Sequence, residues 1–161
     1  MKENWKKYRY IAGMILCVIA FLNLILPRLF SEKPSSADFG QVIEKTFENV
    51  DMTMYPQRDD AAIRKILGLD PSDYEGIWFG RTDNSLNAQE ALIVKFDPDQ
   101  EEKLEEKINE RIASQTEIYG GYAPESAQTA KDAIVQIHPN YLIYVAGENA
   151  AQIAQQFGRA L

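Results

Sequence analysis

The spacing of hydrophobic residues divides the chain into one unbroken apolar run and a longer stretch of alternating patterns. Residues 10–26, YIAGMILCVIAFLNLIL, contain no charged side chain. As a helix, these 17 residues would rise about 25 Å, close to the thickness of the hydrocarbon core of a bilayer. The pattern therefore predicts a transmembrane signal anchor over residues 10–30, which follows a short tail at residues 1–9.

Basic residues give this anchor a direction. They crowd the N-terminal flank at Lys2, Lys6, Lys7 and Arg9. Because cytoplasmic flanks carry the excess of Lys and Arg, we expect a cytoplasmic tail and an extracytoplasmic domain on a single-pass protein of the cell membrane. A cleaved signal peptide ending at Ser35-Ser36-Ala37 would place the cut about 11 residues beyond the run, and a lipoprotein would need a small residue before Cys17. Both alternatives stay open, but the permanent anchor is favoured.

Beyond a polar linker at residues 31–37, the hydrophobic residues recur at helical and strand periods. The helical pattern covers residues 37–51, 61–69, 98–118, 125–133 and 150–157, and the strand pattern covers residues 77–81, 90–96, 134–138 and 141–146. Asp59 or Asp60 begins the second helix, and Gly68 ends it with a left-handed residue. This order predicts an α+β domain over residues 38–161, in which a small, mainly antiparallel four-stranded sheet packs with helices.

The long charged helix that follows Pro98 presents its buried stripe at Leu104, Ile108, Ile112 and Ile118. Aromatic residues gather on the predicted strands and on the Gly120-Gly121 break that ends this helix, at Tyr74, Trp78, Phe79, Tyr119, Tyr122, Tyr141 and Tyr144. Such side chains can stack on a glycan or seat a peptide, but they also form the bulk of a small core, with their hydroxyls at the surface. We favour the core for most of them and predict an exposed binding loop at Tyr119, Tyr122, Pro124 and Glu125.

The distribution of charge along the chain limits the classes of partner that the domain can bind. The net charge of −7 divides into +4 over residues 1–37 and −11 over the remainder. A domain this acidic repels phosphate backbones, so nucleic acid is not expected among its partners. The single cysteine lies in the apolar run, which leaves the domain without a disulfide or a thiolate metal site.

No motif of dependable chemical meaning appears. Asp97, Asp99 and Glu101 alternate as in a calcium loop, but the spacing fails after them, and carboxylates at a helix start explain them more simply. His138, the single histidine, precedes a proline in a predicted hairpin, where a turn residue is the simpler interpretation. We therefore predict no catalytic residue, no metal site and no cofactor.

Four segments carry a resemblance to a known family. They are YEG at residues 74–76, QEALIVK at 89–95, YGGYAP at 119–124 and YLIYV at 141–145. Together they resemble the bacterial membrane-anchored proteins of the domain of unknown function 4358, found mainly in Gram-positive anaerobes. The resemblance implies an extracytoplasmic domain on a single anchor or lipid tether over about residues 38–158, and it brings no catalytic residues.

The leading functional expectation is a non-catalytic interaction module, anchored in the membrane and directed at an envelope protein, peptide or glycan. The alternative is a carboxylate-dependent envelope hydrolase, for which Glu90 and Glu125 are the nominal candidates.

Overall fold

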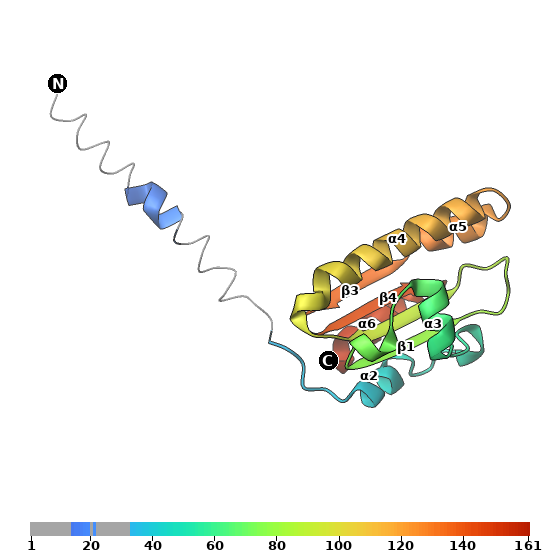
Figure 1. The fold of residues 1–161 in the computed structure, drawn as a ribbon, viewed down its shortest axis with the longest axis horizontal. Helices are drawn as coiled ribbons and strands as arrows, with labels where there is room; N and C mark the ends of the chain where they lie inside the picture. Colours follow the sequence, from blue (N-terminus) through green and yellow to red (C-terminus); the bar gives the residue numbers. More distant parts are fainter. Residues whose placement is uncertain (1–13, 20, 22–32) are drawn as a thin grey trace, which may run out of the picture. The chain divides into compact units, whose positions relative to one another are not determined.

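The structure is a computed structural model that describes residues 14–19, 21 and 33–161 (Figure 1). The chain separates into two compact units, Met1–Lys33 and Pro34–Leu161. Residues 14–19 and 21 are helical, and most of the predicted anchor lies outside the described residues. Among those residues, no helix combines the length and the apolar character that crossing a bilayer requires.

The second unit is built on a four-stranded sheet in the order β1-β2-β4-β3, with every neighbouring pair antiparallel. Its strands are β1 (Gly76–Arg81), β2 (Glu90–Lys95), β3 (Ile134–His138) and β4 (Tyr141–Ala146). In the central pair, Glu90 lies opposite Ala146 and Lys95 opposite Tyr141. This register places the β1–β2 loop, residues 82–89, at one end of the sheet and the β3–β4 turn at the other.

Helices cover both faces of the sheet (Figure 1). They are α2 (Phe39–Thr46), η1 (Met52–Met54), α3 (Asp60–Leu67), η2 (Pro71–Asp73), η3 (Pro98–Gln100), α4 (Glu101–Gly120), α5 (Pro124–Lys131) and α6 (Ala150–Ala160). On one face, α2 and α6 bury Val42 and Phe157 against Ile93 and its neighbours. On the other face, α3 and α4 bury their apolar residues against Phe79, Leu92 and Val94. The predicted α+β class and the four-stranded antiparallel sheet are confirmed.

Local signals account for several element boundaries. The Asp59 carboxylate accepts a hydrogen bond from the Ala62 amide at 2.8 Å and begins α3. Gly68 adopts φ = 66° and ends that helix, as predicted. Before α4, the Gln100 side chain accepts a hydrogen bond from the Asp97 amide at 3.1 Å, in keeping with a helix start rather than a calcium loop.

Two expectations about the helices are wrong in detail. The first helix covers Phe39–Thr46 rather than residues 37–51, because Asn49 has φ = 60° and Asp51 begins the separate turn η1. Ile118, predicted in the buried stripe of α4, is half exposed. The buried positions of that helix continue instead through Gln115 and Tyr119.

The start of the second unit is fastened to the β3–β4 turn. The Asn140 side chain accepts a hydrogen bond from the Ser35 amide at 2.8 Å and donates one to the Ser35 carbonyl at 2.9 Å. The Ser35 hydroxyl donates to the carbonyl of Leu161, and the Tyr141 hydroxyl donates to the carbonyl of Ala37. We call this region, formed by residues 35–37, the β3–β4 turn and Leu161, the entry end of the sheet.

Candidate functional site

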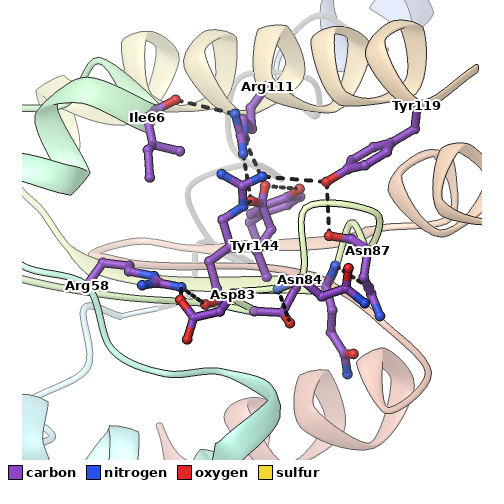
Figure 2. Close-up of polar contacts among 12 residues, drawn as sticks. Arg58, Ile66, Asp83, Asn84, Asn87, Arg111, Tyr119 and Tyr144 are labelled. Carbon is purple, nitrogen blue, oxygen red and sulfur yellow. Dashed lines mark hydrogen bonds and ion pairs between the residues drawn. The ribbon is translucent and has the colours of Figure 1, made fainter. Parts of the chain in front are cut away.

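A buried carboxylate lies at the opposite end of the sheet, where β2 begins. Glu90 is completely buried, and Arg111 of α4 binds both of its oxygens. The two contacts join Nε to Oε1 at 2.8 Å and Nη2 to Oε2 at 2.7 Å, which is the paired geometry that a guanidinium and a carboxylate favour (Figure 2). Tyr144 of β4 donates its hydroxyl to Oε1 at 2.8 Å.

A second arginine completes this buried charge cluster, which we define as Arg81, Glu90, Arg111, Tyr119 and Tyr144. Arg81 Nε lies 3.5 Å from Glu90 Oε2 as an ion pair. Arg81 Nη2 donates to the Tyr119 hydroxyl at 3.5 Å, and that hydroxyl donates in turn to the Asn87 carbonyl at 2.9 Å. The cluster therefore connects β1, β2, β4 and α4 with the β1–β2 loop.

Strand register and helix periodicity explain why these residues meet. Arg81 is the direct partner of Glu90 in the β1–β2 pairing. Glu90 lies on the same face of β2 as the buried Leu92, because side chains alternate along a strand. Arg111 and Tyr119 lie eight positions apart on α4, close to two helical turns, so both face the sheet.

Burial sets the protonation of the groups around Glu90. Burial, with the adjacent charge of Glu90 and its hydrogen bond, raises the pKa of Tyr144 well above its usual value. The Tyr144 hydroxyl therefore stays neutral near pH 7 and keeps the proton that it donates. Burial opposes the charge of Arg111, but the hydrogen bond and charge of Glu90 outweigh it and raise the pKa of Arg111. Arg111, Tyr144 and Arg81 thus hold the Glu90 carboxylate in place.

The predicted binding loop divides between the interior and the surface. Tyr119 is buried, and its hydroxyl bonds inside the protein rather than reaching the surface. Tyr122 is 55 % exposed, with its ring centroid 5.7 Å from that of Tyr119. Pro124 is the first residue of α5, and Glu125 lies in the first turn of that helix; both are exposed.

The β1–β2 loop packs beside the turn that joins α4 to α5 (Figure 1). The Ser126 hydroxyl donates to the Leu86 carbonyl at 2.6 Å, and Ala88 is buried against Tyr119 and Ala130. Leu86 itself is 60 % exposed. We call this region, formed by residues 51–55, the β1–β2 loop, residues 117–126 and residues 147–148, the loop end of the sheet.

The two carboxylates that were nominal catalytic candidates lie in different settings. Glu90 is enclosed by the charge cluster, whereas Glu125 is exposed on α5. The ring of His138 lies 5.7 Å from the ring of Phe157. Among the described residues, no three or more His, Cys, Asp or Glu side chains gather as metal ligands would.

Periodicity in the sequence contained a signal for the cluster, which the expectation of purely apolar buried faces overlooked. Arg111 follows the buried Ile108 by three positions, so its side chain falls on the buried stripe of α4. Glu90 alternates with Leu92 and Val94 on one face of β2. Two opposite charges on two predicted buried faces would have indicated a pair between them.

The fold and the cluster define the class of this protein: an α+β domain whose four-stranded antiparallel sheet carries helices on both faces. The chain belongs to the family described as Domain of unknown function (DUF4358), which matches residues 48–147. The matched segment contains all four strands and the whole buried charge cluster, whereas α2 and α6 lie outside it. No curated protein and no solved structure matches the chain.

Proposed function

We propose that this protein is a non-catalytic interaction module of the bacterial cell envelope, held by a single N-terminal membrane anchor and directed at an extracytoplasmic partner. The observation that carries the proposal is the placement of exposed apolar residues at the loop end, opposite the end where the chain enters the domain. The acidic charge of the domain and the apolar run at residues 10–26 support it as well.

The length of the central strands gives the distance between the two ends of the sheet. Each central strand has six residues, which at about 3.3 Å per residue spans roughly 20 Å. A tether joined before Pro34 attaches at the entry end, because Ser35 is bonded to Asn140 there. The loop end is therefore the end of the sheet opposite the attachment point.

The surroundings of Glu90 favour binding over hydrolysis. A carboxylate that acts as a general acid or base must come within hydrogen-bonding reach of its substrate. Both oxygens of Glu90 are occupied by Arg111 and Tyr144, and its side chain has no exposed surface. The carboxylate thus supports the loop end from beneath, in the manner of a structural residue.

Two measurements on the full chain test the proposal. For topology, Tyr122→Cys in a Cys17→Ser background is treated with a membrane-impermeant maleimide on intact protoplasts. Labelling before lysis is expected; labelling only after lysis would reverse the topology and refute the proposal.

For binding, a photoreactive benzophenone residue replaces Tyr122 in one variant and Lys103, an exposed residue at the start of α4, in a matched control. A discrete crosslinked protein is expected from the Tyr122 position and not from the Lys103 position. Equal adducts at both positions would contradict a binding surface at the loop end.

A further inference from the structure

The exposed large hydrophobic side chains of residues 33–161 gather at the loop end. They are Met52, Met54, Leu86, Ile118 and Tyr122, each more than a third exposed. Single exposed apolar residues are normal on any protein surface. All five lie at one end of the sheet, and exposed apolar residues that gather in one region often mark an interaction site.

Backbone contacts place the two methionines at this end. The segment that follows η1 pairs with the end of β1, where the Arg81 amide donates to the Pro56 carbonyl at 3.1 Å. Tyr55, which adjoins Met54, accepts a hydrogen bond on its hydroxyl from the Gln89 side chain at 3.3 Å. Met52 and Met54 therefore lie beside the β1–β2 loop.

The remaining apolar residues are supported from below. Ile118 and Tyr122 are four positions apart across the end of α4, and Tyr122 rests on the buried ring of Tyr119. Tyr119 is held by the Asn87 carbonyl and by Arg81 of the buried charge cluster. Leu86 is held through its carbonyl by Ser126. A surface ordered in this way loses little conformational entropy when a partner binds.

Carboxylates surround these apolar groups. Exposed acidic side chains at the loop end are Asp51, Asp83, Glu117, Glu125 and Glu148. Arg58 pairs with Asp83 at 2.7 Å, and Arg81 and Arg111 share the buried Glu90, so these five side chains sum to +1. The other four exposed carboxylates contribute −4. The potential around the apolar residues is therefore negative.

We propose that the loop end binds a polypeptide surface that combines apolar side chains with lysine or arginine. The inference rests on the proposed function and names the chemistry of its partner. Apolar groups supply the attraction of burial, and basic side chains complement the carboxylates and steer the encounter. A second copy of this chain would bring like charges together, and an anionic bilayer would be repelled in the same way. Methionine suits such a surface because its flexible thioether adapts to different partners.

The test uses the full chain in zwitterionic lipid nanodiscs, with methyl groups of Met, Leu and Ile labelled for NMR. Three synthetic helical peptides serve as probes: one of Lys, Leu and Trp, one with Glu in place of Lys, and one with Gln in place of Leu and Trp. Empty nanodiscs report binding of the peptides to lipid. Titration with the first peptide is expected to shift the methyl signals of Met52, Met54, Leu86 and Ile118, with an affinity at least about tenfold above that of either other peptide.

Exposed charge reversals give the sharpest control, because they change the potential without disturbing the core. Glu117→Lys combined with Glu125→Lys is expected to weaken binding of the Lys peptide about tenfold and to favour the Glu peptide. A matched variant, Glu102→Lys combined with Glu105→Lys on the exposed surface of the first half of α4, changes the net charge by the same amount and should leave both affinities unchanged.

Several results would overturn the inference: equal affinity for the Lys and Glu peptides, shifts away from the loop end, concentration-dependent shifts without peptide, or shifts caused by anionic lipid alone. The last two would identify a second copy or a bilayer as the occupant. If none of the peptides binds while the residue at position 122 still crosslinks a protein on protoplasts, the proposed function is supported and the proposed partner chemistry is refuted. If maleimide labelling shows that the domain is cytoplasmic, the proposed function is refuted, whether or not the peptides bind.

Discussion

At the entry end of the sheet, Asn140 exchanges two hydrogen bonds with the backbone of Ser35, whereas beneath the loop end two arginines surround one buried carboxylate. The entry end uses neutral groups to join segments more than a hundred positions apart in the sequence. The loop end uses charges to join a helix to the sheet beneath an exposed apolar surface. Neutral bonds that break can be replaced by water, but a buried charge that loses its partner cannot be satisfied in the same way.

The two halves of α4 also differ in whether charged side chains take part in their packing. Its first half packs through Leu104 and Ile108, and its second half adds Arg111, Gln115 and Tyr119 to the apolar Ile112. A purely apolar interface tolerates small sliding motions, whereas a paired guanidinium and carboxylate accept one geometry. The charged half therefore holds the α4–α5 turn in register with the β1–β2 loop, which is the arrangement that the loop end needs.

The largest effect is expected from Arg111→Met. This change removes the bidentate partner of Glu90 and leaves a fully buried carboxylate with the more distant Arg81. The free energy of unfolding should fall by about 3 to 5 kcal/mol. Urea denaturation of the full chain in detergent, followed by tyrosine and tryptophan fluorescence, measures it.

The double variant Glu90→Gln with Arg111→Met is the control, because it removes the buried charge together with its partner. It should recover a large part of the lost stability. Additive losses in the double variant would show that the two residues are not energetically coupled.

A smaller effect is expected from Tyr144→Phe. The hydroxyl donates to a charged acceptor, Glu90 Oε1, and such bonds contribute about 1.5 to 3 kcal/mol. Denaturation at pH 7 should show a loss in this range. An unchanged stability would mean that the Tyr144 hydroxyl does not support Glu90.

The dependence of stability on alkaline pH tests the Tyr144 hydroxyl together with the Tyr141 hydroxyl at the entry end. Burial, with the charges of Asp38 and Glu75, raises the pKa of Tyr141 at the entry end to about 12, and burial with the charge of Glu90 raises the pKa of Tyr144 well above its usual value. In the unfolded chain these hydroxyls ionise near pH 10. The raised pKa values therefore stabilise the fold fully below pH 10, and this stability is lost as the pH rises through them. Tyr144→Phe and Tyr141→Phe should each make that loss of stability less steep, and the part that Tyr141→Phe removes is complete by about pH 12.

The smallest effect is expected from Asn140→Ala at the entry end. The two lost hydrogen bonds join neutral groups, and Ser35 is partly accessible to water, so the cost should be about 1 kcal/mol. Hydrogen exchange should nevertheless accelerate at the amides of Ser35 and Ala37 while the loop end stays protected. Faster exchange at Asn87 and Leu86 would show that the two ends are coupled through the sheet.

Features with a local physical cause were predictable from the sequence. Asp59 and Gly68 bound α3 through a cap and a left-handed residue, and the pattern around Pro139-Asn140 predicted both strands of the second hairpin at their observed limits. Antiparallel hairpins and intervening helices then determined the α+β class. The exposure of Tyr122 was also predicted, since it follows the glycines that end α4.

Features that depend on which elements meet were decided by the tertiary structure. The order β1-β2-β4-β3 depends on which hairpin edges pair, and a strand pattern is identical for either edge. Ile118 is exposed while Arg111 and Tyr119 face the sheet, because α4 ends over the polar start of β2 rather than over its apolar middle. Apolar and polar periodicity on its own determined the anchor prediction, the elements and the sheet class. Only packing decided that a buried carboxylate would support the loop end, because the cost of burying Glu90 is met by side chains from three other elements.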